Sequence, residues 1–305
     1  MNISKLQNEI LELKAKTNTV ILAHTYQAPE IIEIADITGD SFALSKAAAR
    51  TRQQRVIMCG VRFMAETVKI LSPEKTVILP VPSSTCPMAE QILPSRVVAF
   101  RAEHPCCAVV AYINTTAELK AVSDVCVTSS SALKIVSAIE NDEILFIPDK
   151  NLGSWVKEKL PSKNIILMDG YCPVHNSLTE AQVIRAKAEH PDALLAIHPE
   201  CTPDVVKHAD MIGSTAEIID FALKSDRPVI IGTERGVADK LKKDYPERSF
   251  YYLEPEVLVC QDMKAITLEA ILAALKGEGG EAIELDEQLR LRAKKSIDEM
   301  LRLGQ

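Results

Sequence analysis

The sequence predicts an α/β protein of three homologous three-layer αβα units, with parallel sheets, arranged about a pseudo-threefold axis. Short continuous apolar runs are typical of strands that are buried on both faces. Amphipathic segments lie between several of these runs, and strands that alternate with helices favour parallel sheets. A third observation is an internal repeat of 86 to 88 residues, which divides the chain into three similar parts.

Nine apolar runs are the predicted strands. In chain order they read TVILAH, RVIMCG, KTVILP, AVVAYI, EILFIP, NIILMD, ALLAIH, PVIIG and SFYYL. The N-terminal segment has apolar residues at helical intervals and predicts a helix, and KGEGGE at 276–281 reads as a flexible joint before a C-terminal helix. The expected units are 1–105 with the N-terminal helix, 106–191, and 192–305 with the C-terminal helix.

Composition and charge exclude several classes of protein. The 305 residues are 47% apolar and 25% charged, the balance of a soluble globular protein. The formal net charge of −7 argues against a large basic surface, so no nucleic-acid partner is expected. The charged N-terminus does not resemble a signal peptide, and no apolar run reaches the roughly 18–20 residues of a membrane span. We therefore expect a cytoplasmic protein with no membrane partner.

The repeat appears in three columns of polar residues, each spaced by 88 and then 86 positions. The columns are His24-x-Tyr26, Tyr112-x-Asn114 and His198-x-Glu200; Asp36, Asp124 and Asp210; and Ser41, Ser129 and Thr215. The first column lies at the ends of predicted strands, and ligands bind beyond the carboxyl ends of parallel strands. These side chains are therefore expected to face one central cavity.

The hydroxyl column opens helix-like segments, and Ser214 precedes Thr215 in the third of them. Hydroxyls at helix starts are commonly N-caps. The same position also presents free backbone N–H groups to an anion. Three such helix starts around one cavity favour a substrate that is rich in carboxylate or phosphate.

Three of the eight cysteines follow the same repeat. Cys86, Cys172 and Cys260 are spaced by 86 and 88 positions, and each comes a few residues after the last strand of a unit. Without an export signal a disulfide framework is improbable. The other five form no such set, and Cys59 and Cys126 lie in apolar runs typical of buried thiols; the five are Cys59, Cys106, Cys107, Cys126 and Cys201.

Three thiolates that converge on a threefold axis suit a [4Fe–4S] cluster. Protein clusters are usually held by four thiolates, so three leave one iron open to bind substrate oxygens as a Lewis acid. A Cys₃ zinc site with an open position is the alternative. A third possibility is that the three are ordinary buried thiols that repeat because the units are duplicates.

The chain resembles the quinolinate synthase family over nearly its whole length. The motifs that carry the resemblance are, in order, ILAHTYQAPE, DITGDS, FMAETVKIL, TCPMA, AYINTTAE, PDKNLG, CPVH, HPEC, ADMIGST and CQDMKAITL. The resemblance implies three α/β units about a pseudo-threefold axis with the cluster at the centre. It also implies condensation of iminoaspartate with dihydroxyacetone phosphate to quinolinate, with loss of phosphate and two waters, in NAD biosynthesis.

The resemblance assigns roles to residues of this sequence. Cys86, Cys172 and Cys260 match the cluster ligands. The catalytic and substrate-positioning set is His24, Tyr26, Tyr112, Asn114, His175, His198 and Glu200, and the anion binders are Ser41, Ser129, Ser214 and Thr215. The family also implies functional coupling to an aspartate oxidase or dehydrogenase that supplies iminoaspartate.

Three positions depart from the family pattern without removing a proposed ligand. Thr25 and Ser131 stand where Asn is common, and Arg62 stands where His or Asp is common. Arg62 either adds a carboxylate contact or lies on the solvated surface.

Two other classes of function remain open for the same residues. A hydro-lyase would use an open iron on some other hydroxy acid. A phosphosugar-binding protein or iron–sulfur sensor would bind without turnover, but it does not explain the polar residues that recur at strand ends.

Overall fold

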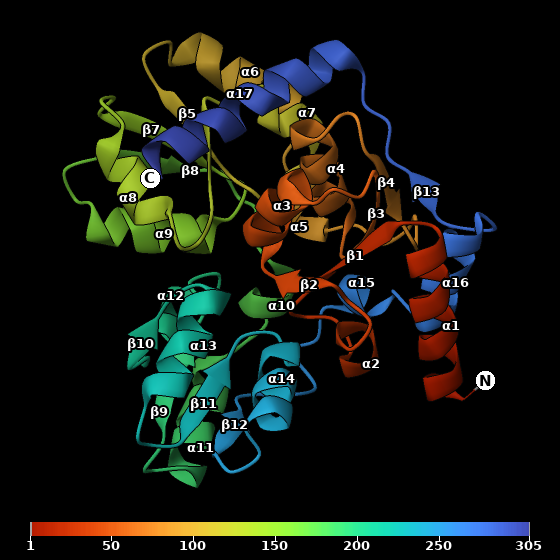
Figure 1. Ribbon diagram of the computed structural model, residues 1–305. Helices are drawn as coiled ribbons and strands as arrows, with labels where there is room; N and C mark the ends of the chain where they lie inside the picture. The colour runs from red at the N-terminus through yellow and green to blue at the C-terminus, as the bar shows by residue number, and fades with distance from the viewer. Residues whose placement is uncertain (1, 305) are drawn as a thin grey trace. The chain divides into compact units, whose positions relative to one another are not determined.

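The computed structural model of the protein describes residues 2–304, and its strands form three separate sheets (Figure 1). One sheet has five strands and two have four, and within the described residues every strand pairing is parallel except that of β13 with β4. The predicted α/β class with three parallel sheets is confirmed. The pseudo-threefold axis and the unit boundaries at 105/106 and 191/192 stay predictions.

The chain divides into two compact units. The first comprises the residues up to Cys86 together with Cys260–Lys294, and the second comprises Pro87–Val259 and the residues from Lys295 on. The first unit holds the five-stranded sheet and the second holds both four-stranded sheets. The C-terminal helix α17 (Glu287–Leu303) is divided between the units: its residues up to Lys294 belong to the first and those from Lys295 on belong to the second.

The first unit is a sheet in the order β13-β4-β3-β1-β2 with helices α1 and α16 packed against each other (Figure 1). Its elements are α1 (Ile3–Lys16), β1 (Thr19–His24), α2 (Pro29–Ile32), β2 (Ile37–Gly39), α3 (Ser41–Arg50), β3 (Arg55–Cys59), α4 (Arg62–Leu71), β4 (Thr76–Leu79), α15 (Gln261–Lys264), α16 (Leu268–Lys276) and β13 (Glu281–Ala282). Every residue of β1 is buried, which is why this strand reads as a continuous apolar run. Ile10 of α1, Ile21 of β1 and Ile271 of α16 belong to one apolar core.

The second unit contains the sheets β6-β5-β7-β8 and β10-β9-β11-β12. Up to β8 its elements are α5 (Pro87–Glu90), α6 (Pro94–Glu103), β5 (Ala108–Tyr112), α7 (Ala117–Lys120), β6 (Val125–Val127), α8 (Ala132–Ala138), β7 (Glu143–Ile147), α9 (Lys150–Lys159) and β8 (Asn164–Leu167). The remaining elements are α10 (Pro173–Asn176), α11 (Glu180–Glu189), β9 (Leu194–Ile197), α12 (Pro203–Val206), β10 (Met211–Ile212), α13 (Thr215–Lys224), β11 (Val229–Gly232), α14 (Gly236–Asp244) and β12 (Phe250–Tyr252).

The aspartate column of the repeat has the same structural role in all three sheets. In each case the carboxylate accepts the backbone N–H of a residue in the first strand of the repeat, and a cation from the preceding helix pairs with it. The N–H donors are Ile21 to Asp36 at 2.8 Å, Val109 to Asp124 at 2.7 Å and Leu195 to Asp210 at 2.8 Å, and the cations are Lys14, Arg101 and Lys187. The aspartates therefore brace the sheets and are not site residues.

A second repeated contact places the three cysteines of the repeat at equivalent points. In each repeat a backbone N–H near the start of a helix donates to the carbonyl oxygen two residues before the cysteine. These bonds are Arg62 to Ser84 at 2.9 Å, Lys150 to Gly170 at 2.8 Å and Arg235 to Leu258 at 2.8 Å. Each cysteine then directly precedes a four-residue helix, α5, α10 or α15. The common spacing thus reflects a common local structure.

The segment KGEGGE contains the end of α16 and the start of a strand that the sequence did not predict. Gly277 ends α16 with a φ of 75°, and Gly280, with a φ of 78°, leads into β13. A positive φ favours glycine, so these residues turn the chain into an edge strand. The strand was missed because it is short and not apolar.

Arg62 is partly buried and pairs with a carboxylate of the chain itself, Glu281. Its Nη1 donates to Glu281 Oε1 at 3.0 Å, and its Nη2 donates to the carbonyl oxygen of Pro82. The Arg62 side chain is 31% exposed. Arg62 therefore joins β13 to the loop after β4 within the first unit.

Candidate active site

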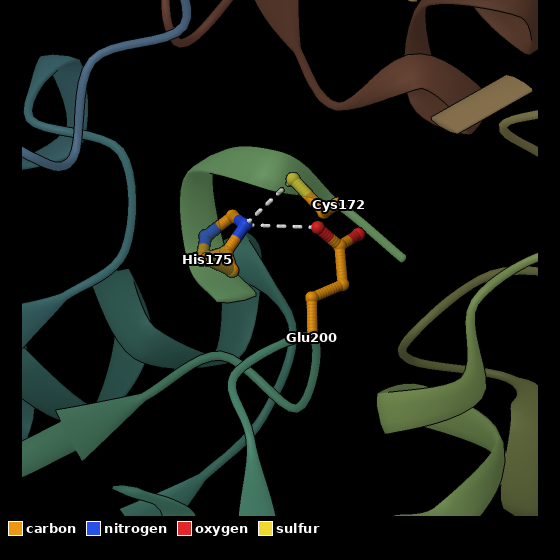
Figure 2. Close-up of side chains that lie close together, drawn as sticks. All are labelled: Cys172, His175 and Glu200. Carbon is orange, nitrogen blue, oxygen red and sulfur yellow. Dashed lines mark hydrogen bonds and ion pairs between the residues drawn. The ribbon is translucent and has the colours of Figure 1, made fainter. Parts of the chain in front are cut away.

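A group of polar side chains gathers in the second unit where strands end. Tyr112 is the last residue of β5, and Glu200 follows β9 by three residues. Cys172 is the N-cap residue of α10, and His175 lies in that helix, which Pro173 begins at a position where its missing N–H costs nothing. Figure 2 shows that the side chains of Cys172, His175 and Glu200 point toward one another.

These side chains form a continuous chain of contacts. The Tyr112 hydroxyl donates to Glu200 Oε1 at 2.7 Å, and Glu200 Oε2 lies 2.9 Å from His175 Nδ1. The same Nδ1 lies 3.3 Å from Cys172 Sγ (Figure 2). On the other side of the ring, His175 Nε2 lies 2.9 Å from Thr233 Oγ1. Neighbouring groups thus lie near or within hydrogen-bond distance, which is the geometry that proton transfer requires.

The surroundings of Glu200 favour its ionised form. His198 stacks on the His175 ring with 4.9 Å between centroids, and its Nδ1 lies 3.9 Å from Glu200 Oε1. Burial by itself raises the pKa of Glu200, but the charges of His198 and His175 and the hydrogen bonds from His175 and Tyr112 outweigh it, so the pKa lies below its ordinary value. Glu200 is thus a buried acceptor, only 4% exposed, beside two imidazoles.

Asp149 holds the loop that carries Cys172. Its Oδ1 accepts the backbone N–H groups of Asn151 and Leu152 at the start of α9, and its Oδ2 accepts the N–H of Cys172 at 3.1 Å. Complete burial and the nearby charge of Glu200 raise the pKa of Asp149, while the three N–H donors oppose that shift. Asp149 therefore positions Cys172 through the backbone.

Asn151 ties the same loops together from the start of α9. Its Nδ2 donates to the carbonyl oxygen of Glu200 at 2.9 Å and to Asn176 Oδ1 at 3.0 Å. One buried amide thus connects the loop after β9 with α10, the helix that carries His175. The PDKNLG motif that contributes Asp149 and Asn151 is part of the site's support.

In the first unit, the predicted residues after β1 contact the helix that follows Cys260. His24 is buried, its Nδ1 accepts the N–H of Tyr26 at 3.2 Å, and the two rings meet edge to face. Lys264 of α15 donates to the carbonyl oxygen of Tyr26. The Ser84 hydroxyl donates to the carbonyl oxygen of Asp262 at 2.7 Å, which joins the loop before Cys86 to the helix after Cys260.

The hydroxyls predicted at helix starts have different local positions. Ser214 is a true N-cap, because its Oγ accepts the N–H of Glu217 in a capping box, and Thr215 is the first residue of α13. Ser41 is likewise the first residue of α3, where the N-cap is Asp40 rather than a hydroxyl. Ser129 lies in the turn before α8, which begins at Ala132.

The thiols differ in how readily they can bind metal as thiolates. Burial raises the pKa of Cys59, Cys126 and Cys201, and it raises the pKa of Cys107 to about 11. The thiolate is the form that binds metal, so these four are poor ligands. The cysteines of the repeat are partly exposed: Cys86, Cys172 and Cys260. Exposure and loop position therefore fit a cluster held by thiolates.

The structure brings part of the predicted site together. Tyr112, Cys172, His175, His198 and Glu200 form one contact group in the second unit. His24 and Tyr26 form a pair in the first unit, and Asn114, half-buried, follows Tyr112 by two residues.

Sequence reasoning missed Thr233, Asp149 and Asn151. Thr233 and Asp149 follow the ends of β11 and β7 within two residues, and Asn151 lies at the start of the adjoining helix α9. The available signal was similar to the one used for Tyr112, a polar residue at or just beyond the end of a buried strand.

No helix among residues 2–304 is both long and apolar enough to cross a membrane.

Comparison with known proteins gives one consistent family. The family model described as "Quinolinate synthetase A protein" matches residues 8–302. The chain is 46% identical to a protein named quinolinate synthase from Alkaliphilus metalliredigens, over 99% of this chain and 100% of that protein. It is 47% identical to the protein of that name from Caldicellulosiruptor bescii, over the whole of both chains. It is 44% identical to the one from Thermodesulfovibrio yellowstonii, over 99% of each.

Proposed function

The chain belongs to the quinolinate synthetase A family of enzymes, and we propose that it condenses iminoaspartate with dihydroxyacetone phosphate. The products are quinolinate, one phosphate and two waters, a step of de novo NAD biosynthesis. An aspartate oxidase or dehydrogenase would supply iminoaspartate, and the cytoplasm is the expected location.

One observation carries the proposal above all others. The Tyr112–Glu200–His175–Cys172 chain of contacts places a predicted cluster ligand next to the predicted acid–base groups. Loss of two waters and formation of an imine both need protons to be moved at defined atoms. A buried carboxylate between a phenol and an imidazole supports such transfers, because each neighbour can give or take a proton through an existing contact.

Cys86, Cys172 and Cys260 would hold a [4Fe–4S] cluster. When bound, the cluster would supply an iron without a protein thiolate, which acts as a Lewis acid on a substrate oxygen. The chain's own contribution is to orient Cys172, through the bond from its N–H to Asp149. The link from Ser84 to Asp262 supports a shared position for the loops of Cys86 and Cys260.

The other predicted residues would bind and orient the substrates. The surroundings of Glu200 keep it ionised, so it would act as an anionic hydrogen-bond acceptor that orients Tyr112 and His175, the two groups that would carry the proton transfers. His24, Tyr26, Asn114 and His198 would position the substrates. Ser41, Ser129, Ser214 and Thr215 would contact their carboxylate and phosphate groups, where helix starts present free N–H groups.

The direct test is product analysis under anaerobic conditions. The purified chain, incubated with iminoaspartate and dihydroxyacetone phosphate, should release quinolinate and one phosphate per turnover. A chain that binds a cluster but dehydrates another hydroxy acid, and forms no quinolinate, would be the open-iron hydro-lyase instead.

Cysteine substitutions test the ligand assignment separately. Cys86→Ser, Cys172→Ser and Cys260→Ser should each remove the cluster absorbance and most of the iron. Cys59→Ser, Cys106→Ser, Cys107→Ser, Cys126→Ser and Cys201→Ser should retain both. Full iron loading in Cys172→Ser would refute the assignment.

Mössbauer spectroscopy of iron-57-enriched protein tests the open iron. Addition of quinolinate should shift one iron site of four. Four equivalent and unresponsive sites would mean a fourth protein ligand and no Lewis-acid role.

A further inference from the structure

Cys172, His175 and Glu200 bring a sulfur, a nitrogen and an oxygen donor to one point. Their ligand atoms all lie within 4.8 Å of one another (Figure 2). Thiolate, imidazole and carboxylate are the three types of protein ligand that Zn²⁺ takes, and three of them with one open position is a common arrangement. The trio shares only Cys172 with the three cysteines of the repeat.

We propose that Cys172, His175 and Glu200 form a mononuclear Zn²⁺ site in the cluster-free chain, and that this site competes with the cluster for Cys172. The metal site itself follows from the second unit alone. The competition, in contrast, rests on the proposed role of Cys172 as a cluster ligand.

The distances between the donors suit a tetrahedral ion. Zinc–sulfur and zinc–nitrogen bonds of about 2.3 and 2.0–2.1 Å put the two donors about 3.6 Å apart, and a zinc–oxygen bond of similar length puts nitrogen and oxygen about 3.3 Å apart. The corresponding distances from His175 Nδ1 are 3.3 Å to Cys172 Sγ and 2.9 Å to Glu200 Oε2. For these two pairs the side chains need to separate by only a few tenths of an ångström, and all three ligand atoms lie within 4.8 Å of one another.

Each of the three ligands already has an outer partner. His175 can donate its Nε2–H to Thr233 Oγ1 at 2.9 Å, which leaves Nδ1 free of a proton and directed at the ion. The Tyr112 hydroxyl donates to the second oxygen of Glu200, and Asp149 accepts the N–H of Cys172. Such partners orient metal ligands, and their loss typically lowers affinity about 10- to 100-fold.

The charges of the site also favour a dication. The Cys172 thiolate and the Glu200 carboxylate carry two negative charges, so one Zn²⁺ makes the group neutral. His175 and Glu200 are 2% and 4% exposed, and an uncompensated charge at such a depth is costly.

Cobalt titration of the full-length chain tests the site. The chain is purified without its cluster, kept anaerobic with a thiol-free reductant, and titrated with Co²⁺. We expect one Co²⁺ per chain with a thiolate-to-cobalt absorption band, displaced by one equivalent of Zn²⁺. Cys172→Ser should lose the band, and His175→Asn and Glu200→Gln should each weaken Co²⁺ binding at least 10-fold. Far-UV circular dichroism checks that each variant is folded. If only one of His175→Asn and Glu200→Gln folds, that variant is enough to test the ligand set.

Three cysteine variants are the matched controls. Cys86→Ser and Cys260→Ser should bind Co²⁺ like the unaltered chain, because neither contributes a ligand to this trio. Cys201→Ser, next to Glu200 in sequence but buried with a raised pKa, should do the same. A band that disappears in Cys86→Ser and Cys260→Ser would show a three-cysteine site, and a band that persists in Cys172→Ser would place the metal elsewhere. Either result overturns the proposal.

Reconstitution tests the competition. Chain preloaded with one Zn²⁺ should take up markedly less iron and sulfide than zinc-free chain, and a chelator should restore uptake. Equal uptake with zinc still bound would refute the competition. Quinolinate formation by the reconstituted chain is measured separately, so failure of the zinc site and failure of the proposed function give different results.

Discussion

Glu200 is the residue on which most contacts of the site converge. It accepts from Tyr112, pairs with His175 and lies near His198, and Asn151 binds its carbonyl oxygen. A buried carboxylate is stable as an anion only when donors and positive charge surround it. Its neighbours therefore determine both its charge and its orientation.

Replacement of this carboxylate should change how stability depends on pH. The folded-state pKa of Glu200 is lowered, so its ionised form stabilises the fold fully above the unfolded pKa of about 4.3, and this contribution is lost as pH falls through the folded pKa. We expect Glu200→Gln to lower the free energy of unfolding at pH 7 by about 1.5–3 kcal/mol, so that the variant unfolds at a lower urea concentration. The difference from the unaltered chain should shrink below pH 4. The fluorescence of Trp155, the single tryptophan, reports unfolding.

Glu180→Gln is the matched control for that experiment. Glu180 pairs with Lys207 and His208 at the exposed surface, where solvent screens the interaction. The Glu180→Gln substitution should therefore change the urea midpoint of unfolding little at any pH. A difference between Glu200→Gln and the unaltered chain that grows on acidification would contradict the assignment of Glu200 as the ionised partner.

Thr233 is a positioning residue for His175. Thr233→Val keeps the shape of the side chain but removes the hydroxyl that faces Nε2 at 2.9 Å. We expect kcat for quinolinate formation to fall roughly 10-fold with little change in KM, and its pH profile to shift, because the loss of one buried partner costs about 1–3 kcal/mol. Thr233→Ser keeps the hydroxyl and should restore both. Equal kcat and pH profiles in the two variants would argue against this role.

At the scale of elements, short helices and turns carry the site on rigid sheets. Cys172 precedes α10, and Gly170 is needed before it, because a Cβ at that position would lie 2.4 Å from the carbonyl oxygen of Pro148. Helix α9 begins at the Asp149 cap and brings Asn151 beneath Glu200. Side chains that must be held precisely are therefore placed at the ends of strands and helices.

At the start of helix α13, two adjacent hydroxyls allow the capping role and the proposed binding role to be tested by different substitutions. Ser214→Ala removes the N-cap and should lower stability by about 1 kcal/mol, as well as weaken the proposed anion contact. Thr215→Ala leaves the cap in place and should weaken binding of dihydroxyacetone phosphate or iminoaspartate roughly 10- to 150-fold. Thermal melts and ligand titrations measure the two effects. If Thr215→Ala binds both substrates normally, Thr215 is not an anion binder.

At the scale of the whole molecule, the apolar cores exclude the three cysteines of the repeat, so we expect folding not to depend on the proposed cluster. The core between α1, β1 and α16 and the core between β9 and β11 are built from aliphatic side chains. Cys86, Cys172 and Cys260 are partly exposed and lie outside both cores. A chain of 305 residues buries enough surface to fold without metal.

Exposure to air should therefore separate activity from folding. An open iron is vulnerable to oxygen, so quinolinate formation should be lost in air while the far-UV circular dichroism stays nearly unchanged. Anaerobic reconstitution with iron and sulfide should restore activity. Unfolding that proceeds in step with iron loss would show that the cluster stabilises the fold.

The sequence alone predicted nine of the thirteen described strands and the repeat. Val and Ile in continuous runs are a local signal, and the equal spacing of Cys86, Cys172 and Cys260 can be read without coordinates. The strands β2, β10 and β13 were missed, because two or three residues without an apolar run leave no periodicity to detect, and β6 was noted only as an apolar run around Cys126.

Only the tertiary structure decided which side chains meet. Thr233 is 58 residues from His175 in sequence, and Asp149 is 23 residues from Cys172. No local sequence pattern predicts either contact. The predicted strand-end residues Tyr112 and Glu200 form a hydrogen bond because β5 and β9 deliver them from different sheets of the second unit. Strand propensity depends on neighbours along the chain, whereas a site depends on packing between elements, and packing is set only when the whole unit has folded.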